Sequence, residues 1–382
     1  MKNKYLIISP YFPSEVSHAG SYIYDQLKAL KKKSNYDIHV IKLVSSHSRA
    51  TDYTYKDINV LTFKVLDIPF FIFPSIFSKI NNYRFNLFLI KNKLDKNIKY
   101  VHAHVCYPGA YLANHIAKCY SAKSIIQHHG IDALQLLNCR FKFIRKIQKS
   151  FLIRNSIKQL NLINLNVYVS NRVRMSLRKY HSFKPNDEFI LYNGVDKNKF
   201  YKTKITTDTD YFVIGCIANF LKIKDHISLI KAIKLIINEN IYNIRLRLIG
   251  SGLELGNCKN YVNEKKLSKY ISFESEVAHE DLNVFYNSIN LFILPSYFEA
   301  SACVLMEAWA TNTPIISIKN QGISELIPEH EYNNLLADPK SPSSLKEKIL
   351  NEYNKKRDYD FDNKFNILNT INEYLNYSFF KQ

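Results

Sequence analysis

The sequence lacks the features that mark several protein classes. Its 382 residues include only 9 glycines, 3 methionines and 1 tryptophan, and its six cysteines form no CxxC pair. Zinc and redox motifs are therefore not indicated, and scattered cysteines suit a reducing compartment. No apolar run reaches the roughly 18 residues of a membrane span. The first ten residues are also too short an apolar run for a signal peptide. We therefore expect a cytoplasmic protein.

Acidic residues are missing from one long stretch, between Asp132 and Asp187. Residues 1–200 carry 32 Lys and Arg against 11 Asp and Glu, whereas the rest of the chain carries 21 against 22. The basic charge thus belongs to the first half alone. Such a field attracts phosphates, anionic lipid or nucleic acid. A solvated helix face in a lysine-rich chain is the alternative.

What the chain does contain is enough apolar sequence for two cores. Apolar residues make up 46% of it, and the length suits two domains of ordinary size. In the first half, the spacing of apolar residues predicts strands at 5–9, 37–43, 100–104, 124–128, 166–170 and 188–192, with helices at 21–33 and 110–118. Strands alternating with helices indicate a parallel, doubly wound α/β sheet.

The same alternation then restarts. The pattern predicts strands at 212–217, 244–249, 271–273, 291–294 and 314–318, and helices at 226–238, 281–288 and 302–310. We therefore predict an N-terminal domain over 1–195 and a second domain over 196–360, joined by a polar linker at 196–210. A C-terminal helix over 361–382 would pack back toward the N-terminal domain. In a two-lobed protein, small ligands bind in the crevice between the lobes.

The strongest chemical signal follows the strand predicted at 291–294. Residues 295–308 read PSYFEASACVLMEA. Glu299 lies in a loop, and Glu307 lies about two turns along a helix that we expect to begin near Ser301 as its N-cap. Two carboxylates suit hydrogen bonding to sugar or ribose diols, and a helix N-terminus suits a phosphate. Two glutamates on a surface helix are the alternative reading of this pattern.

This segment resembles the donor-binding signature of the retaining glycosyltransferases of family 4, which have the GT-B fold. The resemblance is carried by the spacing of Glu299 and Glu307 and by further segments along the chain. These are Ala308-Trp309-Ala310, Pro314-Ile315-Ile316, 322–327, Asn193-Gly194-Val195-Asp196 with Phe200, 215–230, 246–252 and, more loosely, Gly20, His102-Ala103-His104 and 129–132. The fold that it implies is two Rossmann-like, doubly wound domains facing a central cleft.

The resemblance also implies roles for single residues. Lys224 would hold the donor diphosphate, where an ammonium neutralises charge on the leaving phosphate. Glu307 would bind the ribose and Glu299 the transferred sugar, while His129 would lie on the acceptor side. The implied catalytic residues are Glu299, His129 and Lys224, and the implied substrate-binding residues are Gly20, Asp132, Asn219, Gly250, Gly252, Ser301, Ala302, Glu307 and Gly322.

The chain departs from the family pattern at several positions. Asn219 stands where an arginine is frequent, which removes one guanidinium from the phosphate site. Ala19-Gly20 replaces a pair of glycines. Asp225, Asn312 and Asn334 stand at other usual glycines. Because Asp and Asn tolerate left-handed backbone, we expect those three turns to be kept.

Two mechanisms give retention: a covalent intermediate, or front-face attack in which the leaving phosphate accepts the acceptor's proton. Since the resemblance gives Glu299 a binding role, we expect front-face attack. The donor would be a nucleotide-diphosphate sugar, a UDP-sugar more readily than a GDP-sugar, with no metal and no other cofactor. Asp208-Thr209-Asp210 matches a metal-binding motif of another transferase fold, but it precedes a strand in a polar linker. We therefore do not interpret it as a metal site.

Enzymes of this kind commonly serve envelope assembly. The resemblance thus implies transfer of a hexose or N-acetylhexosamine to a saccharide or lipid-linked acceptor, in bacterial lipopolysaccharide, O-antigen or capsule synthesis. The basic half would rest on the anionic inner membrane surface, through an interfacial patch of Phe70, Phe71, Phe73, Phe77, Lys79 and Arg84. Burial of those aromatics is the alternative. A degenerate scaffold protein and a nucleic-acid-binding protein are the competing functions, although no nucleic-acid module is recognised.

Overall fold

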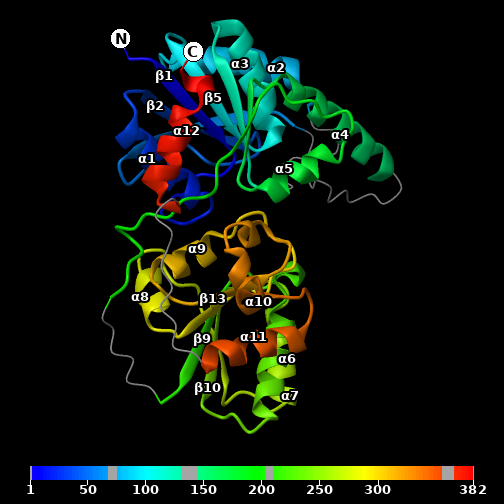
Figure 1. Cartoon of the computed structure of the whole chain (residues 1–382). Coiled ribbons are helices and arrows are strands. Elements are labelled where there is room, and N and C mark those ends of the chain that lie inside the picture. The colour runs from blue at the N-terminus through cyan, green and yellow to red at the C-terminus, as the bar shows by residue number, and fades with distance from the viewer. Residues whose placement is uncertain (1, 68–74, 131–144, 204–209, 355–364, 382) are drawn as a thin grey trace. The chain divides into compact units, whose positions relative to one another are not determined.

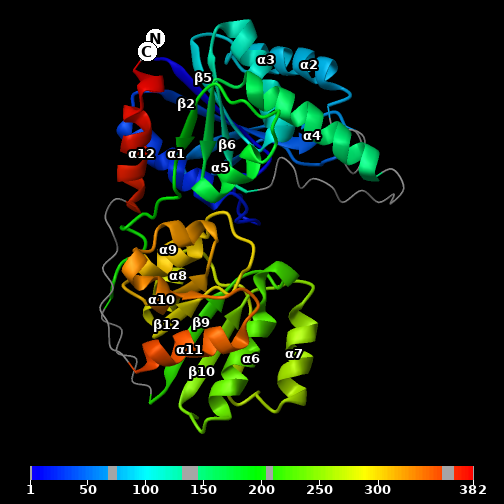
Figure 2. The same ribbon diagram turned by 45° about the vertical axis from the view of Figure 1, so that its right-hand side comes forward.

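The computed structural model describes residues 2–67, 75–130, 145–203, 210–354 and 365–381 (Figures 1 and 2). The chain forms two compact units. Unit 1 contains Met1–Tyr192 and Thr370–Gln382, and unit 2 contains Asn193–Asn369. The division after residue 192 compares with the boundary at residue 195 expected from the sequence. The chain re-enters unit 1 within its last helix, α12 (Ile367–Asn376).

Unit 1 is built on a largely parallel sheet. Its strands are β1 (Lys4–Ser9), β2 (Asp37–Ser45), β3 (Tyr53–Tyr55), β4 (Ile58–Val65), β5 (Ile98–His104), β6 (Lys123–His128), β7 (Leu165–Tyr168) and β8 (Glu188–Ile190). Its helices are α1 (Ser21–Lys33), α2 (Ser78–Lys91), α3 (Tyr111–Tyr120), α4 (Arg145–Leu162) and α5 (Asn171–Arg178), with most of α12.

The strand order in this sheet is β3-β4-β2-β1-β5-β6-β7-β8. The described neighbours are parallel except β3 and β4, which form an antiparallel hairpin. The chain builds outward from β1 in one direction and from β5 in the other. The point between β1 and β5 is therefore the place where loops can diverge and leave room for a ligand.

Unit 2 is built on a second sheet, with the order β11-β10-β9-β12-β13-β14 and parallel pairing throughout its described strands. Its strands are β9 (Phe212–Ile217), β10 (Ile244–Ile249), β11 (Ile271–Glu274), β12 (Leu291–Ile293), β13 (Ile315–Ile318) and β14 (Leu336–Ala337). Its helices are α6 (His226–Ile237), α7 (Leu255–Glu264), α8 (Leu282–Asn287), α9 (Cys303–Ala310), α10 (Tyr332–Leu335) and α11 (Pro342–Tyr353). This is the 3-2-1-4-5-6 order of dinucleotide-binding folds, which reverses between β9 and β12.

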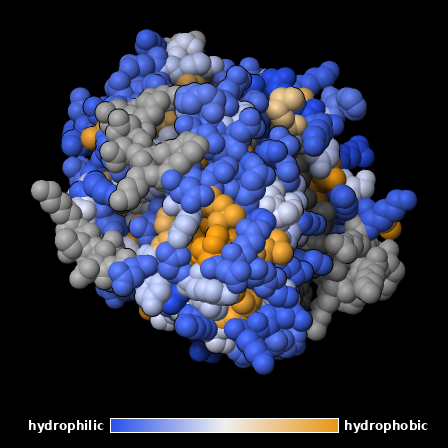
Figure 3. All heavy atoms as spheres, turned by 60° about the horizontal axis from the view of Figure 1, so that its bottom comes forward, coloured by the Kyte–Doolittle hydropathy of each residue, from blue (hydrophilic) through white to orange (hydrophobic). Residues whose placement is uncertain are grey.

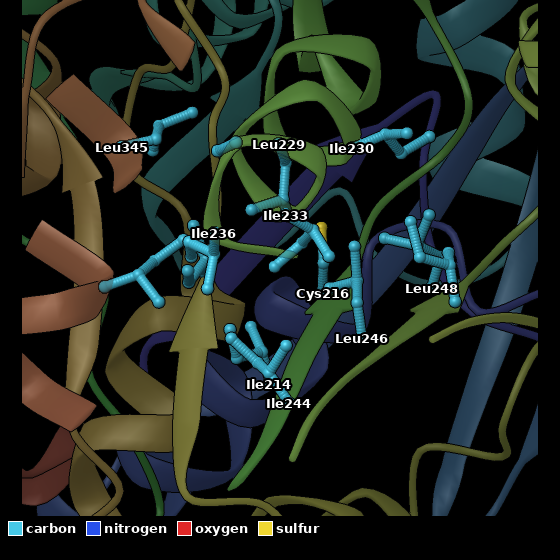
Figure 4. Packing of buried hydrophobic residues seen from close by; sticks show 14 of the residues in the cluster. Ile214, Cys216, Leu229, Ile230, Ile233, Ile236, Ile244, Leu246, Leu248 and Leu345 are labelled. Carbon is cyan, nitrogen blue, oxygen red and sulfur yellow. The ribbon is translucent and has the colours of Figure 1, made fainter. Parts of the chain in front are cut away.

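The core of unit 2 lies where α6 packs on β9 and β10 (Figure 4). Leu229, Ile233 and Ile236 are spaced three and four residues apart, so they share one face of α6. They meet the alternate residues of the two strands that point to the same side, which are Ile214, Cys216, Ile244, Leu246 and Leu248. All of these side chains are buried. This packing holds the start of α6 fixed behind the end of β9.

The end of the chain packs onto the first strand of unit 1. Figures 1 and 2 both show α12 beside α1. The hydroxyl of Tyr374 lies 3.1 Å from that of Tyr5 on β1, and both side chains are buried. Lys123 on β6 donates to the carbonyl of Phe379 at 3.1 Å. The last residues are thus part of the core of unit 1.

The strands and helices predicted from the sequence are present, and within each unit their ends agree to within about two residues. The C-terminal helix is shorter than the predicted 361–382. The prediction of Ser301 as an N-cap is wrong, because α9 begins at Cys303 after Ala302, with no side-chain cap. Glu307 consequently lies about one turn into α9, and not two.

The left-handed turns expected at three former glycine positions are partly confirmed. Asp225 has φ 52° and Asn312 has φ 57°. Asn334 instead lies inside the short helix α10. It has no positive φ, so the expectation of a left-handed turn at Asn334 is wrong.

The face shown in Figure 3 is predominantly hydrophilic, with a group of hydrophobic residues near the centre of that view. Within the ranges that the structure describes, no helix combines the length and the apolar character needed to cross a bilayer.

Gly250 of unit 2 lies where a side chain cannot fit. A Cβ on Gly250 would lie 2.3 Å from the carbonyl oxygen of Ala218, and φ there is 140°. We predict that Gly250→Ala lowers the free energy of unfolding by about 1–3 kcal/mol through backbone strain. Gly256→Ala on α7 is the control, because nothing lies within 4 Å of its Cβ and alanine favours helix. Urea unfolding measures both; equal stability of the two variants would contradict the prediction.

Candidate functional site

The main candidate site in unit 2 lies where the strand order reverses. β9 ends at Ile217 and β12 at Ile293, and the loops that follow carry Lys224 and Glu299. The ammonium of Lys224 forms an ion pair with Oε1 of Glu299, and both side chains are partly buried. Two residues that are 75 positions apart in sequence thus meet because their strands are neighbours. The pair places a cation and a carboxylate together at the carboxyl ends of the two central strands.

Hydrogen bonds fix the loop that carries Glu299. The backbone N–H of Tyr297 and the hydroxyl of Ser296 both donate to the carbonyl of Ile223, each at 3.1 Å. The N–H of Glu299 donates to Oε1 of Gln321 at 2.9 Å, and its carbonyl accepts from the N–H of Gly322 at 3.2 Å. The loop is therefore tied on one side to the turn of Lys224 and on the other to the segment after β13.

The glycine turn after β10 packs against the backbone after β9. Gly252 has φ 143°, and a Cβ there would lie 2.6 Å from the carbonyl of Phe220. The N–H of Phe220 donates to the carbonyl of Ser251 at 2.7 Å. Asn219 lies at this contact with an exposed side chain. The structure thus brings together the predicted residues Asn219, Gly250 and Gly252. Asn219 belongs to the same segment after β9 that carries Lys224.

Glu307 is held from two sides on α9. The hydroxyl of Tyr286 donates to its Oε2 at 2.8 Å, and Nε2 of His279 lies 3.7 Å from its Oε1. Phe200 covers His279 edge-on, with ring centroids 5.5 Å apart. Tyr286 and Glu307 are both buried. Tyr286 and His279 were not predicted as site residues, because nothing in the local sequence marks them as partners of Glu307.

The start of α9 has backbone N–H groups without a side-chain cap and one hydroxyl without a partner. Ala302 is the N-cap and contributes no side-chain cap, so no side chain of the N-cap accepts from the first N–H groups of the helix. The hydroxyl of Ser301 is buried without a hydrogen-bond partner in the described part of the chain. An oxygen-rich ligand at this helix end would satisfy both groups.

Unit 1 has its own cluster at the carboxyl ends of β5 and β6. Gly20 begins α1 with φ 87°, and a Cβ there would lie 2.8 Å from the backbone of Tyr11. Tyr22, the second residue of α1, packs against His129 with the two rings tilted by 45° and their centroids 4.6 Å apart. A hydrogen bond of 2.8 Å joins Nε2 of His129 to Nδ1 of His104. The structure thus brings the predicted Gly20 and His129 into one neighbourhood, whereas Asp132 lies outside the described residues.

A row of imidazoles runs back from His129 into the sheet. His104 stacks on His129 at 5.1 Å and on His102 at 4.5 Å. Nδ1 of His102 is hydrogen-bonded to the hydroxyl of Tyr5 at 2.8 Å, which in turn contacts Tyr374. His102 and His104 alternate along β5, so both point to one face of the sheet. The row therefore connects the end of the chain with His129.

Burial keeps these imidazoles neutral. Removal from water lowers the pKa of His129 to about 3 and that of His102 to about 3, and it holds the pKa of His104 well below its ordinary value. In the bond between His104 and His129, one neutral ring must donate and the other accept. His129 is thus presented as a polar, uncharged group.

Other predicted features are placed less completely. Phe70, Phe71 and Phe73 lie outside the described residues, as do Asp208 and Thr209. Over the ranges that the coordinates describe, no three His, Cys, Asp or Glu side chains gather as metal ligands. Metal independence stays a prediction.

The two halves of the chain match two sequence profiles of one class of enzyme. Residues 197–363 match the profile described as glycosyl transferases group 1. Residues 19–199 match the profile of glycosyltransferase family 4. The chain belongs to glycosyltransferase family 4. Its two sheets are those of the GT-B fold, which confirms the predicted fold class.

Known proteins resemble this glycosyltransferase along much of its length. The uncharacterized glycosyltransferase MJ1178 of Methanocaldococcus jannaschii is 28% identical over 285 residues, 73% of this chain and 71% of that protein. The O-antigen chain mannosyltransferase RfbU of Salmonella typhimurium is 25% identical over 232 residues, 58% of this chain and 62% of that one. The structure of Anabaena Alr3699/HepE in complex with UDP and glucose has a TM-score of 0.70 at 14% identity, covering 98% of this chain and 99% of that one.

The buried histidines make the stability of this glycosyltransferase depend on pH. An unfolded histidine has a pKa of about 6.5, whereas His128, hydrogen-bonded to Asn166, has its pKa lowered by burial to about 4. Below about pH 6.5 the unfolded chain binds more protons, so stability falls as the pH falls toward about 4. Each such histidine contributes up to about 1.4 kcal/mol per pH unit. We predict that His128→Gln reduces this slope in urea unfolding between those values, while the exposed His47→Gln leaves it unchanged. An unaltered slope in His128→Gln would count against neutral burial.

Proposed function

We propose that this glycosyltransferase transfers a hexose or N-acetylhexosamine from a nucleotide-diphosphate sugar, with retention of the anomeric configuration. The donor is a UDP-sugar more readily than a GDP-sugar. The observation that carries the proposal is the pairing of Lys224 with Glu299 at the point where the strand order of unit 2 reverses. A diphosphate can take the ammonium as its counter-ion, and the sugar hydroxyls can donate to the carboxylate. Glu307, about one turn into α9, accepts hydrogen bonds from the ribose hydroxyls.

The chemistry is proposed to be front-face attack. The low pKa of His129 makes it a weak base, so it orients the acceptor hydroxyl by a hydrogen bond and does not remove its proton. The leaving diphosphate takes that proton, and Lys224 stabilises the charge that develops on it. The enzyme then acts mainly by positioning its two substrates, with no metal required.

The acceptor is proposed to be a saccharide or a lipid-linked saccharide of a bacterial surface polysaccharide. The relative RfbU, named as an O-antigen chain mannosyltransferase, supports that class of product. The charge of unit 1 supports a position on an anionic inner membrane surface. A surface hollow along α4 is lined by four basic side chains, namely Lys146, Lys149, Arg154 and Lys158. Such a hollow suits phosphate groups at a membrane surface.

Substitutions at the ion pair test the donor site. We expect Lys224→Ala to lower kcat/KM by about 10²–10³ and to weaken the thermal stabilisation by UDP, because the diphosphate loses its counter-ion. Glu299→Gln should lower transfer by a similar factor while UDP still stabilises the protein, since Glu299 is assigned to the sugar. Lys269→Ala, an exposed lysine of unit 2, is the control for removal of one charge.

Two outcomes would refute this proposal. Normal turnover in Glu299→Gln would remove that carboxylate from the site. Thermal shifts across a panel of nucleotides that showed no preference for any diphosphate would remove the donor class. The configuration of the product, read by NMR from the anomeric coupling of a donor of known configuration, decides retention on its own.

A further inference from the structure

Helix α2 of unit 1 carries apolar side chains that no part of the described structure covers. Its buried side packs Asn81, Phe85 and Leu89 against unit 1. A second set of large apolar residues lies in and just before the helix, each between 48% and 65% exposed. These are Ile76, Ile80, Tyr83, Leu87 and Ile90, with successive spacings of four, three, four and three residues.

That spacing places the exposed residues on one line. At about 100° per residue, the four positions within α2 fall within roughly 80° of the helix circumference, on the opposite side from Leu89, and Ile76 lies in the turn just before the helix. We call them the α2 stripe. The core of unit 1 does not explain an apolar stripe whose side chains stay about half exposed to solvent. An exposed group of apolar residues of this kind marks a contact surface.

Basic residues flank the α2 stripe, and the segment of sequence that carries it has no acidic residue. Lys79 lies beside one edge and Lys91 beside the other, and both are exposed. Lys93 follows with its side chain exposed as well. The sequence holds no Asp or Glu between Asp67 and Asp95. The charged residues on and beside this helix are therefore all basic, and one acidic side chain from elsewhere in unit 1, Asp52, lines a hollow together with Leu87 and Lys91.

We infer that the α2 stripe inserts into the interfacial region of an anionic lipid bilayer, with Lys79 and Lys91 on the headgroups. A helix with an apolar face and lysines at its edges lies in this way in the plane of a membrane surface. The inference deepens the membrane contact proposed above, and it rests on that part of the proposed function and not on the transfer chemistry. It shares Lys79 with the aromatic patch expected from sequence, of which Phe70, Phe71 and Phe73 lie outside the described residues. Phe77 is partly buried, and Arg84 donates to the carbonyl of Lys64 at 2.9 Å and lies over the ring of Phe63.

A second copy of this chain is a poorer occupant. Pairing two α2 stripes would bring Lys79 and Lys91 of both copies together with no acidic residue on either α2 helix, and like charges at the edges of paired helices oppose association. A standard protein interface also takes about 20 to 30 residues a side, whereas the stripe offers five. Charge complementarity thus favours lipid. The packing of the helices also favours lipid. Helix α3 contacts both α2 and the basic helix α4, so the stripe and the basic residues of α4 belong to adjoining helices of unit 1.

Vesicle sedimentation of the full chain tests the inference. We expect wild type to bind vesicles of mixed phosphatidylglycerol and phosphatidylcholine and to bind phosphatidylcholine alone weakly. The double substitution Ile80→Gln with Leu87→Gln should weaken binding more than about tenfold, because two inserted side chains become polar without a change of charge. The matched control is Leu253→Gln with Val284→Gln, two exposed apolar residues of unit 2, which should bind as wild type does.

A tryptophan probe reports insertion directly. The chain has one tryptophan, Trp309, which is buried in α9. Tyr83→Trp adds an exposed one in the middle of the stripe, and its emission should shift to the blue and become protected from aqueous quencher when anionic vesicles are added. Circular dichroism of each variant confirms folding, which half-exposed positions should not disturb.

Three results would overturn the inference. These are undiminished vesicle binding by the double variant, a probe at Tyr83 that stays in water on bound vesicles, and a wild-type dimer that the double variant converts to monomer without loss of lipid binding. The last would assign the stripe to a second copy. Transfer to a water-soluble acceptor and stabilisation by UDP should be the same in wild type and the double variant, so failure here is distinguishable from failure of the donor site.

Discussion

The structure depends on one constraint of parallel sheets, which is that neighbouring strands point the same way and their following loops meet at one edge. Where the chain turns from building on one side to building on the other, those loops diverge and leave their ends unfilled. In unit 2 this happens between β9 and β12, and Lys224 meets Glu299 there. In unit 1 it happens between β1 and β5, where the loop to Gly20 and the end of β5 at His104 lie. Polar side chains lie at both points because the backbone loops diverge there and leave room for a ligand.

The two units handle polar groups at these edges in opposite ways. Unit 2 places a cation beside an anion, and in a partly buried pair of this kind each charge compensates the other. Unit 1 places imidazoles next to one another, where a second positive charge would be costly, and burial keeps them neutral. A charged diphosphate therefore finds a counter-ion only in the first arrangement. A neutral sugar hydroxyl can be oriented by the second without any change of protonation.

Sequence patterns predicted the elements that carry buried, strongly periodic apolar residues, and with them the region of Glu299 and Lys224. They did not indicate α2, because its buried residues and its exposed stripe lie on opposite sides, so apolar residues occur around the helix without a single face. The hairpin β3–β4 was not predicted either. Its turn has a left-handed φ of 52° at Lys56, and no glycine marks that turn in the sequence. Tyr286 and His279 could not be foreseen, because only the tertiary fold brings them to Glu307. Local pattern thus located the loops, whereas contacts between loops needed coordinates.

The loss of an arginine at Asn219 can be weighed against the ion pair. Asn219 is exposed, so an asparagine there leaves no buried charge unpaired, and under the proposed function its effect would fall on the bound diphosphate. Lys224 is already neutralised by Glu299 before a donor arrives. A bare nucleotide diphosphate would draw the ammonium away and leave the carboxylate without a partner, which is costly for a partly buried charge. Under the proposed function an intact donor would avoid that cost, because its phosphate would take Lys224 while its sugar hydroxyls donate to Glu299. With one guanidinium fewer at the phosphates, discrimination between donor and spent nucleotide would then depend more on this exchange, which would favour release of the nucleotide once the sugar has left.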